Sequence, residues 1–266
     1  MDQELALAIL LSGQSALLTG AAGTGKTYLL NTFITQARAQ GKKVSVTATT
    51  GLAATHLAGN TIHSWSGIGI ADQLSNNFFE RLSKTRRDVI GKTDILIIDE
   101  ISMLHDFRLD MVDHVLRHVR QDERPFGGVQ VVMSGDFFQL PRAGNFVVYA
   151  DVWQELKPVV LYLQQQYRQQ DDKLHDILAA LRRCDIRRRH VEALLQRVTP
   201  PPEADTTELH TTNVDVDTIN QARLAALDGE ELTYQQTTTG SKTYVETLAR
   251  SVLAPPILTL KQGALV

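Results

Sequence analysis

The residues whose types and spacing most clearly suggest chemistry form the segment GAAGTGKT, at Gly20–Thr27. It matches the pattern G-x-x-x-x-G-K-[ST] at every position and lies between a strand-like run and a helix-like run. Glycines let backbone N–H groups surround phosphate oxygens, and the start of the helix adds a partial positive charge. Lys26 would reach the β- and γ-phosphates, and the Thr27 hydroxyl would ligate Mg²⁺. The segment predicts a phosphate site made by Gly20, Ala21, Ala22, Gly23, Thr24, Gly25, Lys26 and Thr27.

A pair of carboxylates follows a second apolar run, ILIIDE, at Ile95–Glu100. Ligands of open parallel sheets bind at the carboxyl ends of the strands, where these two side chains emerge. Asp99 would hold the metal directly or through water, and Glu100 would orient and deprotonate the attacking water. A strand that ends in two acids is ordinary by itself, but beside a phosphate loop it favours hydrolysis over binding alone.

A neutral amide, Gln139, follows a third apolar run in the segment GVQVVMSGDFFQLP. At the same sheet edge it could donate to a γ-phosphate and lose that bond after cleavage, whereas a charged side chain would bind permanently or disturb the metal. An amide therefore suits a sensor. The alternative is a glutamine that caps a turn before Pro141, and without other motifs we would favour that alternative.

These segments need a parallel sheet to position them. Five short apolar runs are separated by helix-like stretches, which predicts an α/β fold with strands buried on both faces. A helix over residues 106–120 is indicated by apolar residues on one face. After the prolines near residue 200 we expect a strand over 207–213, a helix over 215–229 and a last strand near residue 257. The five predicted strands are Ala16–Thr19, Val44–Ala48, Ile95–Ile98, Val129–Ser134 and Val159–Leu163.

Composition narrows the class of protein further. Hydrophobic residues make up 43% of the 266 residues, enough for a sizeable core. Cys184 is the single cysteine, so no disulfide forms within the chain, and no apolar run is long enough for a membrane span. We expect a soluble intracellular protein without a membrane partner. The net charge of −3 means that nucleic acid would need a local track.

Taken in order, these motifs resemble the Pif-one (petite integration frequency) family of DNA helicases, in helicase superfamily one B. GAAGTGKT is similar to motif I, ATTGLAATHLAGNTIHSWSGIGI to motifs Ia and Ib, and IIDEISML to motif II. GDFFQLP is similar to motif III and LQQQYRQQD to motif IV, while RPFGGVQ resembles the family's signature. The resemblance implies a P-loop NTPase with a RecA-like parallel sheet and helices on both of its faces.

The resemblance also implies an activity. It is that of a motor driven by ATP and Mg²⁺, which moves five-prime to three-prime on single-stranded DNA and unwinds duplex junctions. Such motors serve repair, recombination, replication or telomere maintenance, in a bacterial cytoplasm or nucleoid or in a nucleus or mitochondrion, and we expect a monomer. Gln3 stands at the adenine-reading position, Gln139 at the γ-phosphate sensor, and Arg168 would reach the γ-phosphate from a second lobe. Thr27 and Asp99 would hold the metal.

DNA contacts follow from the same resemblance. Phe137, Phe138 and Pro141 would tie the shift of Gln139 to the DNA groove. Hydroxyls and N–H groups can hold backbone phosphates without sequence preference, which makes Thr49, Thr50, Gly51, His63 and Ser64 candidates. Trp65 could stack on a base, although a buried aromatic beneath the groove is the interpretation that we favour. The five arginines of Arg182–His190 could contact DNA or a partner, but we favour a solvated helix end.

The domain organisation follows from which motifs occur. We expect a complete first RecA-like lobe over residues 1–158 and the beginning of a second lobe over residues 159–266. Motifs V and VI are absent, so we expect a truncated chain whose isolated activity is weak, and Arg142 replaces a proline that the family has after QLP. Two alternatives stay open: a RecD-like or relaxase-type helicase subunit, and a nucleotide-binding module without turnover.

Overall fold

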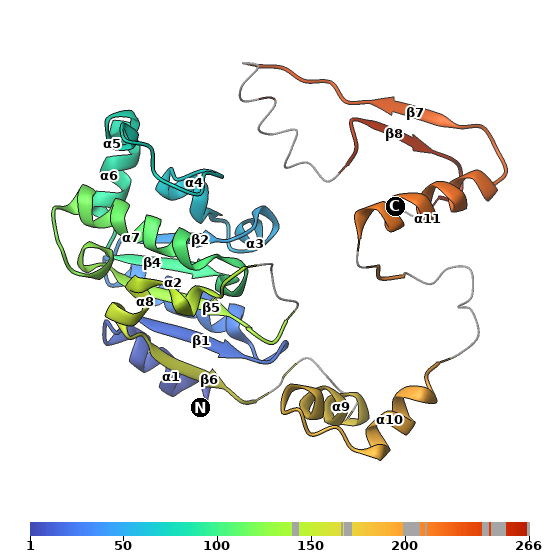
Figure 1. Cartoon of the computed structure of the whole chain (residues 1–266), viewed down its shortest axis with the longest axis horizontal. Coiled ribbons are helices and arrows are strands. Elements are labelled where there is room, and N and C mark those ends of the chain that lie inside the picture. The colour runs from blue at the N-terminus through green and yellow to red at the C-terminus, as the bar shows by residue number, and fades with distance from the viewer. Residues whose placement is uncertain are drawn as a thin grey trace. The chain divides into compact units, whose positions relative to one another are not determined.

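The computed structural model of the chain describes residues 1–139, 144–165, 167, 172–198, 208–210, 212–240, 245 and 254–264. The chain divides into two compact units, Met1–His190 and Val191–Val266 (Figure 1). The predicted lobe boundary after residue 158 stays a prediction. Strand β6, which begins at Val159, pairs with β1 inside the first unit.

A six-stranded parallel sheet, in the order β3-β2-β4-β5-β1-β6, organises the first unit. The five predicted strands are confirmed to within one residue at either end, and a short strand, β3, is added at one edge. Because every pairing is parallel, the carboxyl ends of all strands lie along one edge of the sheet. The strands are β1 Ala16–Gly20, β2 Val44–Ala48, β3 Asn60–Thr61, β4 Ile95–Asp99, β5 Gln130–Gly135 and β6 Val159–Leu163.

Helices cover both faces of this sheet, which confirms the predicted α/β fold. Alternate side chains of β4 enter different cores: Ile97 packs in the same core as α1 and α2, and Ile98 in the same core as α7. This period-two division explains why β4 is apolar at consecutive positions. The helices of the first core are α1 Gln3–Leu11 and α2 Lys26–Ala39, and those of the second include α4 Ile62–Ser66, α6 Lys84–Lys92, α7 Asp106–Arg120 and α8 Asp151–Leu156.

Helix α7 has the bounds that its apolar spacing predicts. Leu109, Val112, Val115 and Leu116 are fully buried, and Val119 packs partly buried at the edge of the same core. The remaining elements of the first unit are short, apart from α9 near its end. They are α3 Gly51–His56, α5 Phe78–Arg81, the 3₁₀ turns η1 Ile101–Met103, η2 Pro125–Gly128 and η3 Val147–Tyr149, α9 Asp172–Arg182, and α10 Arg188–Leu195, which continues past residue 190.

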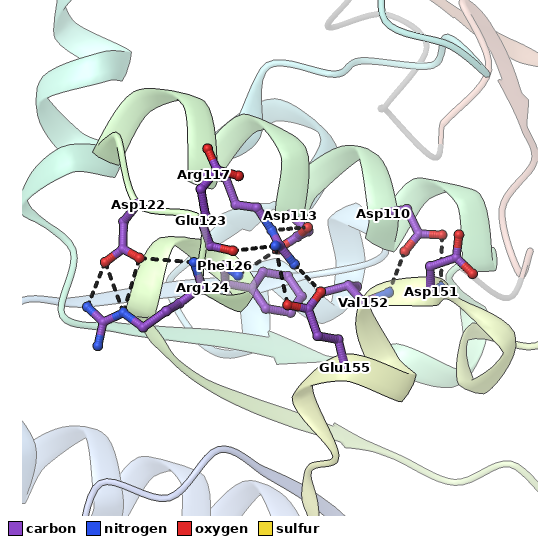
Figure 2. Close-up of polar contacts among 10 residues, drawn as sticks. All are labelled: Asp110, Asp113, Arg117, Asp122, Glu123, Arg124, Phe126, Asp151, Val152 and Glu155. Carbon is purple, nitrogen blue, oxygen red and sulfur yellow. Dashed lines mark hydrogen bonds and ion pairs between the residues drawn. The ribbon is translucent and has the colours of Figure 1, made fainter.

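A polar network joins α7 to the turn that starts β5 (Figure 2). The carboxylate of Asp113 accepts hydrogen bonds from the Phe126 N–H at 2.5 Å and from Arg117 Nε at 2.7 Å. Arg117 also pairs with Glu155 of α8 at 2.6 Å. Phe126 is fully buried and has a left-handed φ of +53°. The network therefore holds the RPFGG turn, which precedes β5, against α7 and α8.

The second unit contains helix α11 (Asn213–Ala226) and an antiparallel pair of strands, β7 (Leu232–Gln235) and β8 (Ile257–Leu260). The predicted helix starts two residues earlier than expected and ends three residues sooner, and the last predicted strand is confirmed. The prediction of a strand over 207–213 is wrong for the described residues of that range: residues 208–210 form no strand, and α11 begins at Asn213. Within the described parts of the chain, no helix has the length and apolar character needed to cross a bilayer.

Candidate functional site

The phosphate-loop segment connects the end of β1 to the first turn of α2. Gly25 precedes α2 with a left-handed φ of +80°. The positive φ favours glycine, and a Cβ atom at Gly25 would lie 2.2 Å from Gln3 Nε2, so it would push the Gln3 amide out of its place. Gln3, at the start of α1, donates from Nε2 to the Thr24 carbonyl at 3.2 Å. The structure therefore brings Gln3 into contact with the phosphate loop, although Gln3 and Thr24 are 21 residues apart in sequence.

Lys26 folds back into this loop. Its Nζ donates to the carbonyls of Gly20 at 2.8 Å and Ala21 at 3.1 Å. Burial lowers the pKa of the Lys26 ammonium, and the negative charges of Asp136 and Glu100 oppose that effect most strongly. The ammonium thus lies where phosphate oxygens would replace carbonyl oxygens as its partners.

The two acidic residues occupy different environments at the end of β4. Asp99 is the last residue of the strand and is 8% exposed, while Glu100 turns the chain with a left-handed φ of +52°. Burial raises the pKa of both carboxyls, and Asp99 raises that of Glu100 further. A strained backbone at a titratable residue is typical of functional sites. A raised pKa also brings Glu100 closer to what a general base requires.

Thr49, at the end of β2, supports that corner. Its N–H donates to the Asp99 carbonyl at 3.1 Å, and its hydroxyl donates to the Glu100 carbonyl at 2.9 Å. The neighbouring strand thereby holds the backbone of both acids. Thr49 is 7% exposed, so its hydroxyl is already engaged within the protein, and its DNA contact stays a prediction.

A cavity of about 370 Å³ lies beside the phosphate-loop segment, within the size range of small-ligand sites. It brings together side chains from three predicted motifs, Lys26, Glu100 and Gln139. Gln139 is exposed, and its N–H donates to the Asp136 carbonyl at 3.2 Å, which closes the turn after β5. Arg168 and Pro141 lie outside the described residues.

The sequence analysis missed two aromatic residues that line the same cavity, Tyr28 and Tyr167. The Tyr167 N–H donates to the Gly23 carbonyl at 2.9 Å, which fixes the segment just before Arg168 against the phosphate loop. The sequence indicates these tyrosines only by their position next to predicted site residues: Tyr28 follows Thr27, and Tyr167 precedes Arg168.

The donor set fits Mg²⁺ as the metal. Mg²⁺ prefers oxygen ligands and usually binds through one or two protein oxygens, with water and substrate phosphates completing its shell. The Thr27 hydroxyl and the Asp99 carboxylate are such a sparse set. In the ranges that the structure describes, no group of three or more histidine, cysteine, aspartate or glutamate residues could form a metal cage.

Four of the remaining candidates for DNA contact lie at helix starts, and the fifth, Phe138, lies in the turn after β5. Thr50 caps α3, accepting from the Ala53 N–H at 3.2 Å, and Gly51 follows it on the surface. His63 and Ser64 lie in the first turn of α4, and Phe138 is 68% exposed. Trp65 is only 8% exposed, which favours the buried-aromatic interpretation. Cys184 is exposed.

Comparisons with known proteins show the family to which the chain belongs. Residues 2–181 match the family model of the PIF1-like helicase. The chain is 43% identical to the ATP-dependent DNA helicase Pif1 of Psychrobacter sp. (strain PRwf-1), covering 100% of this chain and 43% of that protein. It is 32% identical to the ATP-dependent DNA helicase RRM3 of Saccharomyces cerevisiae, covering 100% and 39%. The chain thus spans about two fifths of the length of these curated relatives.

Solved structures give the same result. The Pif1 helicase of Candida albicans superposes with a TM-score of 0.81 at 33% identity, covering 97% of this chain and 62% of that one. A Bacteroides Pif1 bound to single-stranded DNA superposes with a TM-score of 0.76 at 28% identity, covering 98% and 63%. A Bacteroides Pif1 in complex with ADP-AlF4 superposes with a TM-score of 0.79 at 27% identity, covering 97% and 63%.

Proposed function

This chain belongs to the PIF1-like helicase family, and on that premise we propose that it is the ATP-hydrolysing part of a DNA helicase. The proposed motor moves five-prime to three-prime on single-stranded DNA and opens duplex junctions inside the cell. Its work would lie in DNA repair, recombination, replication or telomere maintenance. The observation that carries the proposal is the cavity lined by Lys26, Glu100 and Gln139, which lie on the segments that follow three neighbouring strands, β1, β4 and β5.

Each residue has a distinct part in the proposed reaction. Lys26 leaves the carbonyls of Gly20 and Ala21 and binds the β- and γ-phosphates. Glu100 takes a proton from the attacking water, and its raised pKa favours that transfer. Gln139 donates to the γ-phosphate until cleavage. Thr27 and Asp99 would hold Mg²⁺, which when bound neutralises charge on the phosphates. Gln3 would read the base, and Arg168 would stabilise charge from the second lobe.

Single-stranded DNA is the proposed partner, and a monomer is the proposed working form. A Bacteroides relative was solved with single-stranded DNA bound. The described candidates in this chain follow the carboxyl ends of β2, β3 and β5; they are Thr49, Thr50, Gly51, His63, Ser64 and Phe138. Neutral donors at these positions suit a motor that must release the DNA backbone at each step.

DNA-stimulated phosphate release tests the proposal, measured on the native protein that carries this sequence. We expect ATP hydrolysis to rise when single-stranded DNA is added and to disappear in Lys26→Ala. The circular dichroism spectrum of Lys26→Ala should remain that of the folded protein. Unwinding should require a five-prime single-stranded tail. A protein that binds ATP but shows no hydrolysis with or without DNA would overturn the motor in favour of a nucleotide-binding module.

A further inference from the structure

One arginine of the Arg182–His190 segment differs from its neighbours. Arg182, the last residue of α9, donates from Nη1 to Asp136 Oδ2 at 2.8 Å. The two side chains are only 16% and 4% exposed. Arg187 and Arg189 of the same segment pair with Asp185 and Asp176 while their side chains are 64% exposed. Arg182 is therefore not part of a solvated helix end, and its ion pair is shielded from solvent screening.

Asp136 shapes the turn that carries the proposed phosphate sensor. Its Oδ1 accepts from the Phe138 N–H at 3.1 Å, and its backbone carbonyl accepts from the Gln139 N–H at 3.2 Å. The side chain and the main chain of Asp136 thus hold two successive N–H groups of the turn after β5. The remaining carboxylate oxygen, Oδ2, is the one that Arg182 binds.

Arg182 also contacts two aromatic side chains. Its guanidinium lies 4.5 Å from the ring centroid of Phe138, and its Nε donates to the Tyr162 hydroxyl of β6 at 3.2 Å. Cation–π contact and a charge-assisted hydrogen bond both depend strongly on geometry. One side chain therefore joins α9 and β6 to the turn that presents Phe138 and Gln139.

We propose that Arg182 is a positioning residue for ATP hydrolysis: it holds the Asp136–Gln139 turn so that Gln139 faces the phosphate cavity, and it links the position of α9 to that turn and to Phe138. The inference rests on the proposed function, because Arg182 can affect ATP hydrolysis through this turn only if the protein hydrolyses ATP in the adjacent cavity. A small displacement of α9 would break or restore the pair with Asp136. Because a carboxylate as buried as that of Asp136 is costly to leave unpaired, a movement of Arg182 with α9 would also move the Asp136–Gln139 turn.

The first test is steady-state ATP hydrolysis, with and without single-stranded DNA, in the native protein that carries this sequence. Arg182→Ala should lower the DNA-stimulated kcat by roughly tenfold or more, the equivalent of one charge-assisted hydrogen bond, with KM for ATP changed by less than about threefold. Arg182→Lys, which keeps the charge, should recover part of the loss. Arg183→Ala, the exposed neighbour, should match the unmodified protein. Equal rates for the Arg182→Ala and Arg183→Ala variants would overturn the inference.

The second test does not depend on turnover. Hydrogen–deuterium exchange of the nucleotide-free protein should become at least about tenfold faster at the Phe138 and Gln139 amides in Arg182→Ala, but not in Arg183→Ala. Exchange along β5 should stay slow, which excludes global unfolding. If Arg182→Ala does not fold, Arg182→Gln, which keeps an N–H donor but is shorter and uncharged, takes its place. Unchanged exchange at these amides refutes the positioning role, whereas absent hydrolysis in the unmodified protein refutes only the proposed function.

Discussion

The Asp113 network of Figure 2 allows a quantitative prediction about stability. Asp113→Ala removes the acceptor of the Phe126 N–H, which is buried under a fully buried ring. A buried backbone donor left without a partner costs about 1–3 kcal/mol. The same change removes one of the two carboxylate partners of Arg117, while Glu155 remains. Because the second partner remains, the loss should stay below the roughly 3–5 kcal/mol of a fully orphaned buried charge.

We therefore expect Asp113→Ala to lower the free energy of unfolding of the first unit by about 3 kcal/mol. Asp113→Asn should cost less, about 1–2 kcal/mol, because its amide oxygen can still accept from the Phe126 N–H. Asp122→Ala is the matched control on the same turn. Asp122 pairs with Arg124, which holds the pKa of Asp122 at about 2, but the pair is exposed and should contribute little.

Urea unfolding followed by tryptophan fluorescence measures these effects, because both tryptophans, Trp65 of α4 and Trp153 of α8, lie in the first unit. With a denaturant dependence near 2 kcal/mol per molar, the Asp113→Ala midpoint should fall by about 1.5 M. A midpoint within about 0.3 M of the unmodified protein would refute the reasoning, since it would mean that water or a relaxed turn satisfies the Phe126 N–H. An equal loss in Asp122→Ala would refute it too, because the effect would then come from surface charge.

Three further predictions concern the same elements. Asp113→Asn should be more destabilising near pH 4 than near pH 7. Burial raises the pKa of the Asp113 carboxyl above 3.8, so the folded state binds this proton more tightly than the unfolded state does. The stability that the proton contributes to the unmodified protein is fully present below 3.8 and is lost as the pH rises through the folded pKa. Unfolding free energies of both proteins across that interval measure it, and a pH-independent difference would contradict it. Gly25→Ala should weaken binding of a fluorescent ATP analogue at least about tenfold, because its Cβ would displace the Gln3 amide from the Thr24 carbonyl and so from the position where it would read the base. Gly41→Ala, at a similar φ of +81° with nothing within 4 Å, should leave affinity unchanged. Glu100→Gln should lower kcat at least about a hundredfold while ATP affinity stays within about threefold, measured by phosphate release and by titration, and a kcat within tenfold of normal would remove Glu100 as the base.

Local sequence was enough to predict the sheet and the phosphate loop. β1 and β4 are buried along their whole length and β5 nearly so, and their apolar residues are visible without knowing their neighbours. The edge strand β6 exposes Val159, Val160 and Tyr162. The carboxyl ends of β1, β4 and β5 were expected to meet at one edge because strands separated by helix-like stretches run parallel. Helix α7 followed from a single apolar stripe, and GAAGTGKT from glycines whose backbone freedom is a local requirement.

Only the tertiary structure decided which side chains from distant segments meet. Asp136 and Arg182 are 46 residues apart, and nothing in either segment separates Arg182 from the four arginines that follow it. Gln3 against Gly25, Thr49 beneath Glu100 and Asp113 on the Phe126 N–H are contacts of the same kind. Backbone conformational preferences and the periodicity of hydrophobic residues act over a few residues, so each segment's own sequence determines them. The partner of a buried charge instead depends on how separate elements pack, and that becomes defined only when the sheet assembles.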